Sequence, residues 1–217
     1  HLNALRQLSL LYPGIDMRSS YLDKRAGRGV TILWRKDIPY RHPTCDVDGT
    51  NKRSVRLCFE GANGHKLTIA AGYIEKHNNT LTCKEEERAF YRFHEAGIPP
   101  PNSPKHLYVL AGDLNTVINP ATQRLPPCSN TAEGNEALHR FLRNNFLVEI
   151  INFKYPGGGN FTHIHHDNEE SKAKLDHIIL NDTALNACTA AGHTEKNPIF
   201  PSDHGIVWTA FDTASNG

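Results

Sequence analysis

The chain has 217 residues, of which 38% are hydrophobic, and its 24 lysines and arginines nearly balance its 23 aspartates and glutamates. This length and composition predict one domain, spanning residues 1–217, with an apolar core. The net charge of +1 excludes a protein that is basic throughout, although a local basic rim would be enough to bind a nucleic acid. No apolar run approaches the roughly 18 residues of a membrane-spanning helix, so we expect no membrane partner.

The first half of the chain predicts a short helix and several strands. Leucines recur at every third position near the start, and apolar runs bounded by glycine-rich turns follow. The elements expected there are, in chain order, a helix at residues 2–11, a strand at 29–34, a polar loop at 41–53 and a hairpin of strands 55–59 and 66–73.

The second half predicts more strands than helices. Periodic segments ended by glycine or proline indicate two helices, and short aliphatic runs indicate strands. The elements expected there are helices at 82–96 and at residues ending near 144–145, and strands at 107–111, 147–151, 161–164, 175–180 and 206–211. Many strands with few helices predict packed sheets flanked by helices.

The cysteines predict the redox compartment. The chain has five, at positions that form no C-x-x-C pair: Cys45, Cys58, Cys83, Cys128 and Cys188. An odd number with scattered spacing predicts free thiols in a reducing compartment, and it argues against a structural zinc site. We therefore expect an intracellular protein, nuclear or cytoplasmic.

Polar side chains follow, interrupt or precede three apolar runs. Asp113 and Asn115 lie at the end of the run 107–111, two positions apart, so on an extended segment both point to the same side. Asp176 lies inside an aliphatic run, where a carboxylate is costly to bury unless it is paired. Asp203 and His204 precede the last strand, and Asp176 is the candidate partner that fixes the imidazole of His204.

These three segments together resemble the endonuclease/exonuclease/phosphatase superfamily, which has the DNase-I-like fold. The resemblance begins at residues 28–34 and ends at Ser202-Asp203-His204, and residues 29–37 are similar to the nuclease domains of LINE-type retrotransposons. It implies an α/β (α+β) fold, a four-layered sandwich of two mixed β-sheets flanked by helices. It also implies that the chain lacks the first strand-helix-strand of the fold. The sequence begins as if directly after the position that holds the metal-binding glutamate in the superfamily.

The resemblance assigns roles to six residues. Asp113 is implied as the carboxylate that activates water, Asn115 as a donor that orients phosphate or water, and His204 as the catalytic histidine oriented by Asp176. Tyr73 is implied as a phosphate contact, and Asp203 as the carboxylate near a divalent cation, Mg²⁺ or alternatively Mn²⁺. The six expected site residues are Tyr73, Asp113, Asn115, Asp176, Asp203 and His204.

The chain departs from the superfamily pattern near this site. Ala71 replaces the asparagine that precedes the tyrosine at Tyr73, and Lys174 stands where an arginine is common, which keeps the charge but loses the guanidinium fork. His163 follows Phe161-Thr162 where many members have a tryptophan or phenylalanine. With two nearby histidines it indicates either a metal site or a solvated histidine-rich loop.

The resemblance favours a Mg²⁺-dependent phosphodiesterase, specifically a DNA endonuclease of retroelement type, with DNA as partner and a possible fusion to a reverse transcriptase. Two alternatives stay open: a degenerate, catalytically impaired remnant or nucleic-acid-binding module of the same fold, and a phosphatase of the same superfamily. Because the implied metal-binding glutamate is absent, we expect weak Mg²⁺ binding by the chain itself.

Overall fold

A six-stranded sheet forms the centre of the computed structural model, which describes residues 10–20, 29–41, 43–49, 53–75, 81–125, 132–156, 160–165, 168–194 and 202–212. Its strands, in spatial order, are β3 (Thr44–Val47), β4 (Ser54–Glu60), β5 (Lys66–Tyr73), β6 (His106–Asp113), β11 (Asp176–Asn181) and β8 (Leu147–Glu149). The neighbours β5 and β6 are parallel, whereas the other neighbouring pairs are antiparallel.

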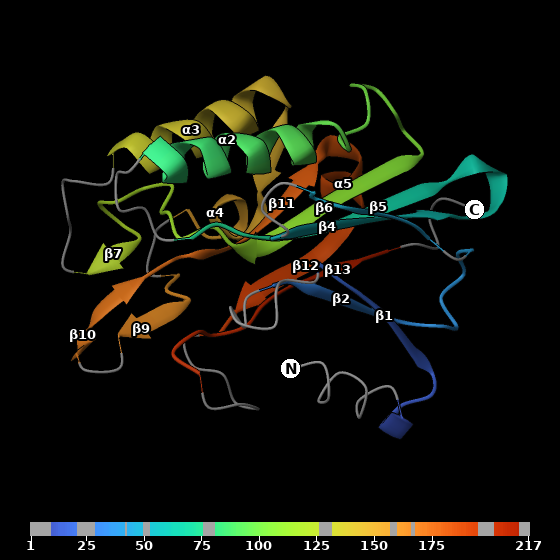
Figure 1. Cartoon of the computed structure of the whole chain (residues 1–217), viewed down its shortest axis with the longest axis horizontal. Coiled ribbons are helices and arrows are strands. Elements are labelled where there is room, and N and C mark those ends of the chain that lie inside the picture. The colour runs from blue at the N-terminus through green and yellow to red at the C-terminus, as the bar shows by residue number, and fades with distance from the viewer. Residues whose placement is uncertain are drawn as a thin grey trace.

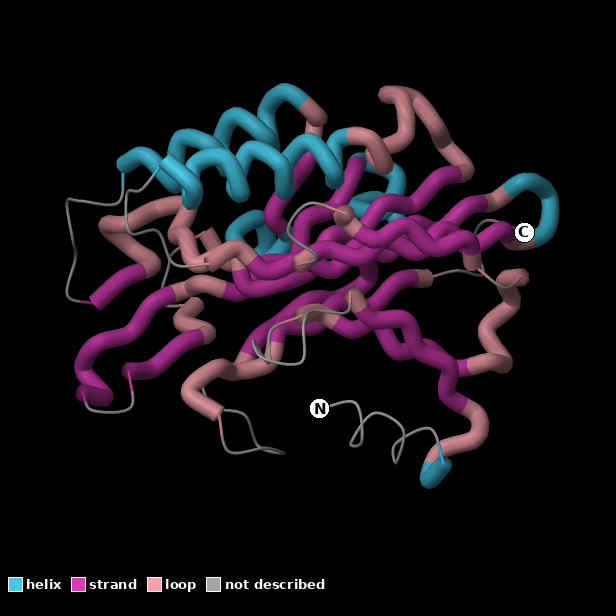
Figure 2. The backbone as a smooth tube through the Cα atoms, in the orientation of Figure 1, coloured by secondary structure: helices cyan, strands magenta, loops and turns pink. Residues whose placement is uncertain are grey.

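Different elements cover the two faces of this sheet (Figure 1). Helices α2 (Leu81–Glu95) and α3 (Ala132–Asn144) lie on one face. Two antiparallel strand pairs lie on the opposite face, β1 (Ile15–Ser19) with β2 (Thr31–Arg35), and β12 (Cys188–His193) with β13 (Val207–Phe211). Figure 2 shows these layers as a helical layer above two levels of strands. The helical layer expected outside the strand pairs is not among the described residues.

Shorter elements connect these layers. A three-stranded sheet of β7, β10 and β9 lies at one end of the molecule (Figure 1), and short helices follow β8 and β11. Their bounds are β7 (Arg124–Leu125), β9 (His163–His165), β10 (Asn168–Ala173), α4 (Ile150–Lys154), α5 (Asp182–Ala187) and the 3₁₀ turn η1 (Ala62–Gly64).

Strand β6 shows how the sequence pattern builds two cores. Tyr108 and Leu110 pack with Phe90 of α2 under the helices, whereas Leu107 and Val109 pack on the other face with β11, α4 and β12. A strand turns successive side chains to opposite faces, so a continuous apolar run belongs to a strand buried on both sides. Each such side chain stabilises the fold by roughly 1.5–3 kcal/mol when it is fully buried.

Five strands of the described structure were not predicted from the sequence. Strand β3 lies within the segment 41–53, which the sequence predicted as a loop, and all four of its residues are exposed. An edge strand without a buried face needs no apolar alternation, so its sequence gives no signal. The strands β1, β7, β10 and β12 were missed as well.

Two expected elements differ in extent from those observed. The strand predicted at 147–151 ends at Glu149, whose side chain accepts a hydrogen bond from the backbone N–H of Asn152 at 2.7 Å and so begins α4. The helix predicted at 2–11 lies outside the described residues except for Leu10 and Leu11, which are helical.

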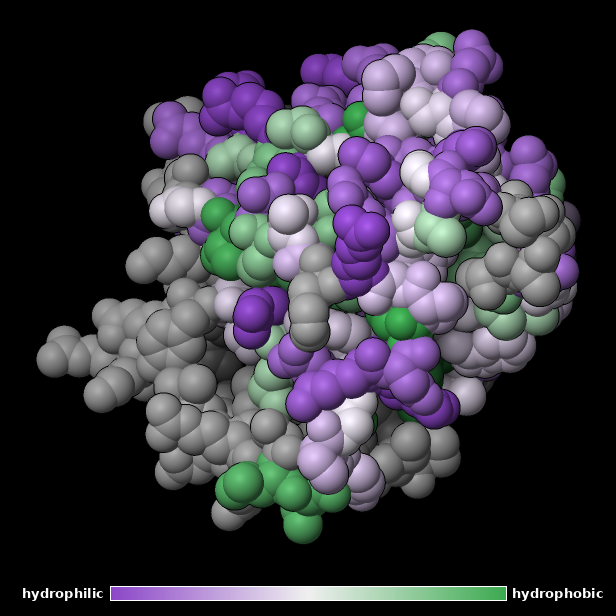
Figure 3. All heavy atoms as spheres, turned by 90° about the vertical axis from the view of Figure 1, so that its right-hand side faces the viewer, coloured by the Kyte–Doolittle hydropathy of each residue, from purple (hydrophilic) through white to green (hydrophobic). Residues whose placement is uncertain are grey.

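The surface and the cysteines agree with the composition of the chain. On the face drawn in Figure 3, hydrophilic side chains predominate and hydrophobic ones are scattered, apart from one group at its lower end. Cys45, Cys58 and Cys188 are free thiols, as predicted, whereas Cys83 and Cys128 lie outside the residues whose side chains are described. Among the described residues, no helix is long and apolar enough to cross a membrane.

Candidate active site

Strand register alone brings three of the expected site residues into one row. Tyr73 at the end of β5 is the Cα partner of Asp113 at the end of β6, and Asp113 is the Cα partner of Asp176 at the start of β11. Residues that are partners in register have side chains on the same face. The apolar residues at the same alternate positions of β6 and β11 pack toward β12 and β13 and form a hydrophobic core. The row of polar site residues lies on the same face, at the boundary of that core.

Asn115 holds the carboxylate of Asp113 in place. Its backbone is in the left-handed region with φ of 48°, and its N–H donates to Asp113 Oδ1 at 2.9 Å. Its side-chain Nδ2 donates to Asp113 Oδ2 at 3.2 Å and to the carbonyl of Ile74 at 2.7 Å. Both Nδ2 hydrogens are therefore used within the protein, and the contacts of Asn115 are those of a residue that orients Asp113.

The environment of Asp113 raises its pKa to about 6. Burial contributes most, because it disfavours the charged form, and the negative charge of Asp176 raises the pKa further. The N–H of Asn115 and the charge of His204 act in the opposite direction. A carboxylate with this pKa is ionised at neutral pH and still accepts a proton readily.

His204 and Asp176 form the hydrogen bond that the sequence predicted. The Nδ1–H of His204 donates to Asp176 Oδ2 at 2.9 Å, and this bond raises the pKa of His204 above its usual value. Asp176 is itself held, because Thr162 Oγ1 accepts the backbone N–H groups of Leu175 and Asp176, each at 3.0 Å. With Nδ1 fixed in this way, Nε2 is the nitrogen that His204 has available for a ligand.

His163 lies against His204, which the sequence did not predict. The two rings have centroids 4.8 Å apart, and the two residues form an isolated antiparallel bridge. His163 Nε2 is 3.4 Å from Asp203 Oδ2. Burial, together with the charge of His204, lowers the pKa of His163. Histidine clustering near 163–166 was the available signal, but sequence could not show which of these histidines faces His204.

Lys174 is turned away from this row and is buried. Its Nζ donates to Glu149 Oε2 at 2.7 Å and to Asn152 Oδ1 at 3.1 Å, and its side chain has no exposed surface. On the same carboxylate, Glu149 Oε1 lies 3.8 Å from His177 Nδ1. The lysine at the position where the superfamily commonly has arginine therefore joins β8, α4 and β11 in the core.

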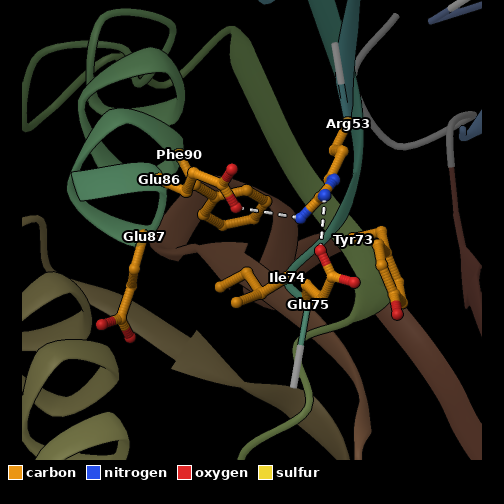
Figure 4. A pocket seen from close by; sticks show the side chains of 7 residues that line it. All are labelled: Arg53, Tyr73, Ile74, Glu75, Glu86, Glu87 and Phe90. Carbon is orange, nitrogen blue, oxygen red and sulfur yellow. Dashed lines mark hydrogen bonds and ion pairs between the residues drawn. The ribbon is translucent and has the colours of Figure 1, made fainter. Parts of the chain in front are cut away.

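Tyr73 also lines a small pocket between β5 and α2, which contains both charged and apolar side chains (Figure 4). Arg53 lies in its centre and pairs with Glu75 at 2.5 Å and with Glu86 at 3.1 Å. The hydroxyl end of Tyr73 points away from these ion pairs in Figure 4. Paired charges thus line this pocket, and Tyr73 lies between the pocket and the row of site residues.

Comparison with solved structures places this geometry in a known fold. The chain is similar to an AP endonuclease of Leishmania major, with a TM-score of 0.75 and 13% identity over 94% of this chain and 72% of that one. It is also similar to the 3'-5' exonuclease NExo of Neisseria meningitidis, with a TM-score of 0.74 and 15% identity over 94% and 82%. The fold is DNase-I-like.

The DNase-I-like fold extends to a retrotransposon protein. The endonuclease domain of TRAS1, a telomere-specific non-LTR retrotransposon, has a TM-score of 0.59 and 13% identity over 88% of this chain and 77% of that domain. No family model matches the sequence, and no curated protein matches it significantly. The similarity is therefore one of fold, and the roles of the site residues remain predictions.

Proposed function

We propose that the chain is a Mg²⁺-dependent phosphodiesterase that cleaves DNA. The single observation that carries this proposal is the arrangement of Asp113, Asp176 and His204, in which a carboxylate with a raised pKa lies beside a fixed imidazole. Hydrolysis of a phosphodiester needs a base for the attacking water and a group that stabilises charge on the phosphate. These residues supply both.

In the proposed reaction Asp113, positioned by Asn115, accepts a proton from the water that attacks phosphorus. The cationic form of His204, oriented by Asp176, stabilises the growing negative charge on the phosphate oxygens through Nε2. Tyr73, in register with Asp113, is placed to contact the same phosphate through its hydroxyl. The new bond joins the water oxygen to phosphorus, and the electron pair of the broken P–O bond leaves with the nucleic-acid oxygen.

The residues present fit a hard divalent cation at Asp203. The side chain of Asp203 is 46% exposed, so its carboxylate is accessible from solvent. Mg²⁺ takes oxygen ligands and is commonly held by one or two carboxylates together with substrate phosphates. When bound there, it would supply neutralisation of the phosphate charge.

We propose DNA as the substrate because the solved proteins of similar fold are DNA-processing enzymes by their names. They include AP endonucleases, the TRAS1 endonuclease domain and a Neisseria 3' phosphatase bound to a product DNA hairpin. Within this class we propose an endonuclease of retroelement type, as residues 29–37 suggest, with a reverse transcriptase as the partner to which such a domain is fused. The phosphatase of this fold is the second candidate, favoured by the 3' phosphatase among these structures.

The proposal is tested by nicking of supercoiled plasmid in Mg²⁺. We expect His204→Ala and Asp113→Ala to lower the rate by roughly 10²–10⁴-fold, the usual contribution of a positioned acid or base. The matched control is His65→Ala, at the opposite end of β5 from Tyr73, which should nick at the rate of the unchanged chain.

Two further substrates decide between the candidates. Release of phosphate from a 3'-phosphorylated duplex without plasmid nicking would favour the phosphatase. Cleavage of an abasic-site duplex alone would place the activity with the AP endonucleases. Binding of DNA without any His204-dependent cleavage would overturn the proposal in favour of a non-catalytic binding module.

A further inference from the structure

The strongest unassigned feature is a cluster of three metal-binding side chains, His163, Asp203 and His204. One ligand atom from each residue lies within 4.8 Å of the other two. Two of them, His163 Nε2 and Asp203 Oδ2, are already 3.4 Å apart. Ligands at about 2.1 Å from a tetrahedral ion lie about 3.4 Å from one another, so a small side-chain rotation closes the set.

The backbone holds this cluster from both sides. The segment around His163 and the segment around His204 form an antiparallel bridge, flanked by two hydrogen bonds. The N–H of Ile164 donates to the carbonyl of Asp203 at 2.9 Å, and the N–H of Gly205 donates to the carbonyl of Thr162 at 2.7 Å. The three side chains therefore start from fixed positions, which lowers the conformational cost of binding an ion.

A second layer of contacts prepares His204 as a ligand. Its Nδ1–H donates to Asp176 Oδ2 at 2.9 Å, which leaves Nε2 as the coordinating nitrogen. A carboxylate behind a histidine is the common arrangement at zinc sites, where it fixes the ring and makes it a better ligand. Asp176 is in turn held by Thr162 Oγ1 through its backbone N–H at 3.0 Å.

The donor set selects the class of metal. Two imidazoles and one carboxylate are the ligands of open zinc sites, whereas Mg²⁺ prefers oxygen ligands only. The side chains of His163, His204 and Asp203 are 21%, 30% and 46% exposed, so an ion can enter from solvent and keep a fourth position for water.

We propose that His163, Asp203 and His204 bind one Zn²⁺-class ion and that this ion inhibits the phosphodiesterase. Inhibition rests on the proposed function: zinc would occupy Nε2 of His204, which the proposed reaction needs, and the carboxylate of Asp203, which would hold Mg²⁺. His163 is the residue that gives this chain the site, because many members of the superfamily have phenylalanine or tryptophan there.

Metal binding is measured first, without any assay of activity. After removal of metal with a chelator, the whole chain is titrated with Co²⁺, followed by visible absorption, and with Zn²⁺, followed by calorimetry. We expect one site per chain with the intense absorption of tetrahedral cobalt and no thiolate-to-cobalt band. His163→Phe should weaken Zn²⁺ binding at least tenfold, as the loss of one of three ligands requires.

His165→Phe is the matched control, because this exposed histidine lies on the same strand, β9, outside the cluster. It should leave the Zn²⁺ affinity unchanged. Equal weakening by both variants, a thiolate band, or no stoichiometric binding would overturn the proposed site.

Inhibition is measured second, by plasmid nicking at fixed Mg²⁺ with increasing Zn²⁺. The unchanged chain and His165→Phe should lose activity at the Zn²⁺ concentration that fills the site, and His163→Phe should need at least tenfold more. Retained activity of the unchanged chain at saturating Zn²⁺ would refute inhibition. If Zn²⁺ binds as expected but no nicking occurs at all, the proposed function fails while the metal site stands.

Discussion

The surroundings of Asp113 and His204 raise the pKa of both groups, but by different physical causes. Burial raises the pKa of Asp113 to about 6, and the hydrogen bond from His204 to Asp176 raises the pKa of the imidazole. In the proposed reaction the first group must have lost its proton and the second must have kept one. Both conditions hold together over an interval near neutral pH, because Asp113 ionises below the pH at which His204 loses its proton.

These two protonation requirements predict a bell-shaped dependence of the nicking rate on pH. Activity should rise through about pH 6 as Asp113 ionises, and it should fall at higher pH as His204 becomes neutral. Asp176→Asn removes the charge that stabilises the imidazolium, so the falling limb should move to lower pH while the maximum rate also drops. The check is the Mg²⁺-dependent rate from pH 5 to 9; an unchanged falling limb in Asp176→Asn would contradict these assignments.

At the scale of elements, the parallel strands β5 and β6 place Tyr73 beside Asp113. One position earlier in each strand, two glycines are paired and allow the strands to approach closely. Gly72 and Gly112 are Cα partners, and a Cβ built on Gly112 would lie 1.8 Å from the carbonyl oxygen of Gly72. That distance is far inside van der Waals contact, and the atom that would have to move is backbone. Close approach of these two strand ends therefore requires glycine at position 112.

Gly112→Ala should destabilise the chain by about 3 kcal/mol or more, which is at or above the upper end of the usual cost of overpacking. The measurement is the free energy of unfolding in urea. Gly14→Ala is the matched control, since a Cβ there meets nothing within 4 Å, and it should change stability little. If Gly112→Ala folds with full stability, the two strands have more freedom than the register implies.

At the scale of the whole molecule, a buried charge network ties the sheet to the segments around the site. Lys174 Nζ joins Glu149, at the end of β8, to Asn152 of α4, and Glu149 Oε2 also accepts the N–H that begins α4. Gln123, which accepts the backbone N–H groups of Ile118 and Asn119, donates to the same Asn152 Oδ1. The loop after Asp113 is thus connected to β8, an edge strand of the sheet.

Lys174→Met should cost about 3–5 kcal/mol of stability, because it leaves the buried carboxylate of Glu149 without its cation. Adding Glu149→Gln should recover part of that loss, since the amide oxygen still accepts the N–H of Asn152 without a charge. Urea unfolding of both single variants and the double variant measures the coupling. Equal stability of Lys174→Met and the unchanged chain would show that the pair contributes nothing to the fold.

The sequence by itself determined the strands that carry the site. The aliphatic runs at β5, β6 and β11 were predicted at nearly their observed bounds, because strands buried on both faces need continuous apolar residues. Asp113 and His204 were singled out by the resemblance of their segments to the superfamily, and Asp176 also because a carboxylate inside an aliphatic run is costly to bury unless it is paired. The hydrogen bond of 2.9 Å between His204 and Asp176 confirms the contact expected between these two residues.

Only the tertiary structure decided what surrounds those residues. The sequence did not predict the contact of His163 with His204 or the burial of Lys174 against Glu149. Both contacts depend on which distant segments pair with one another. The edge strand β3 was missed for a related reason, since its stability comes from backbone pairing with β4 rather than from its own side chains. Local patterns specify which faces are buried; pairing between distant segments specifies which polar groups meet.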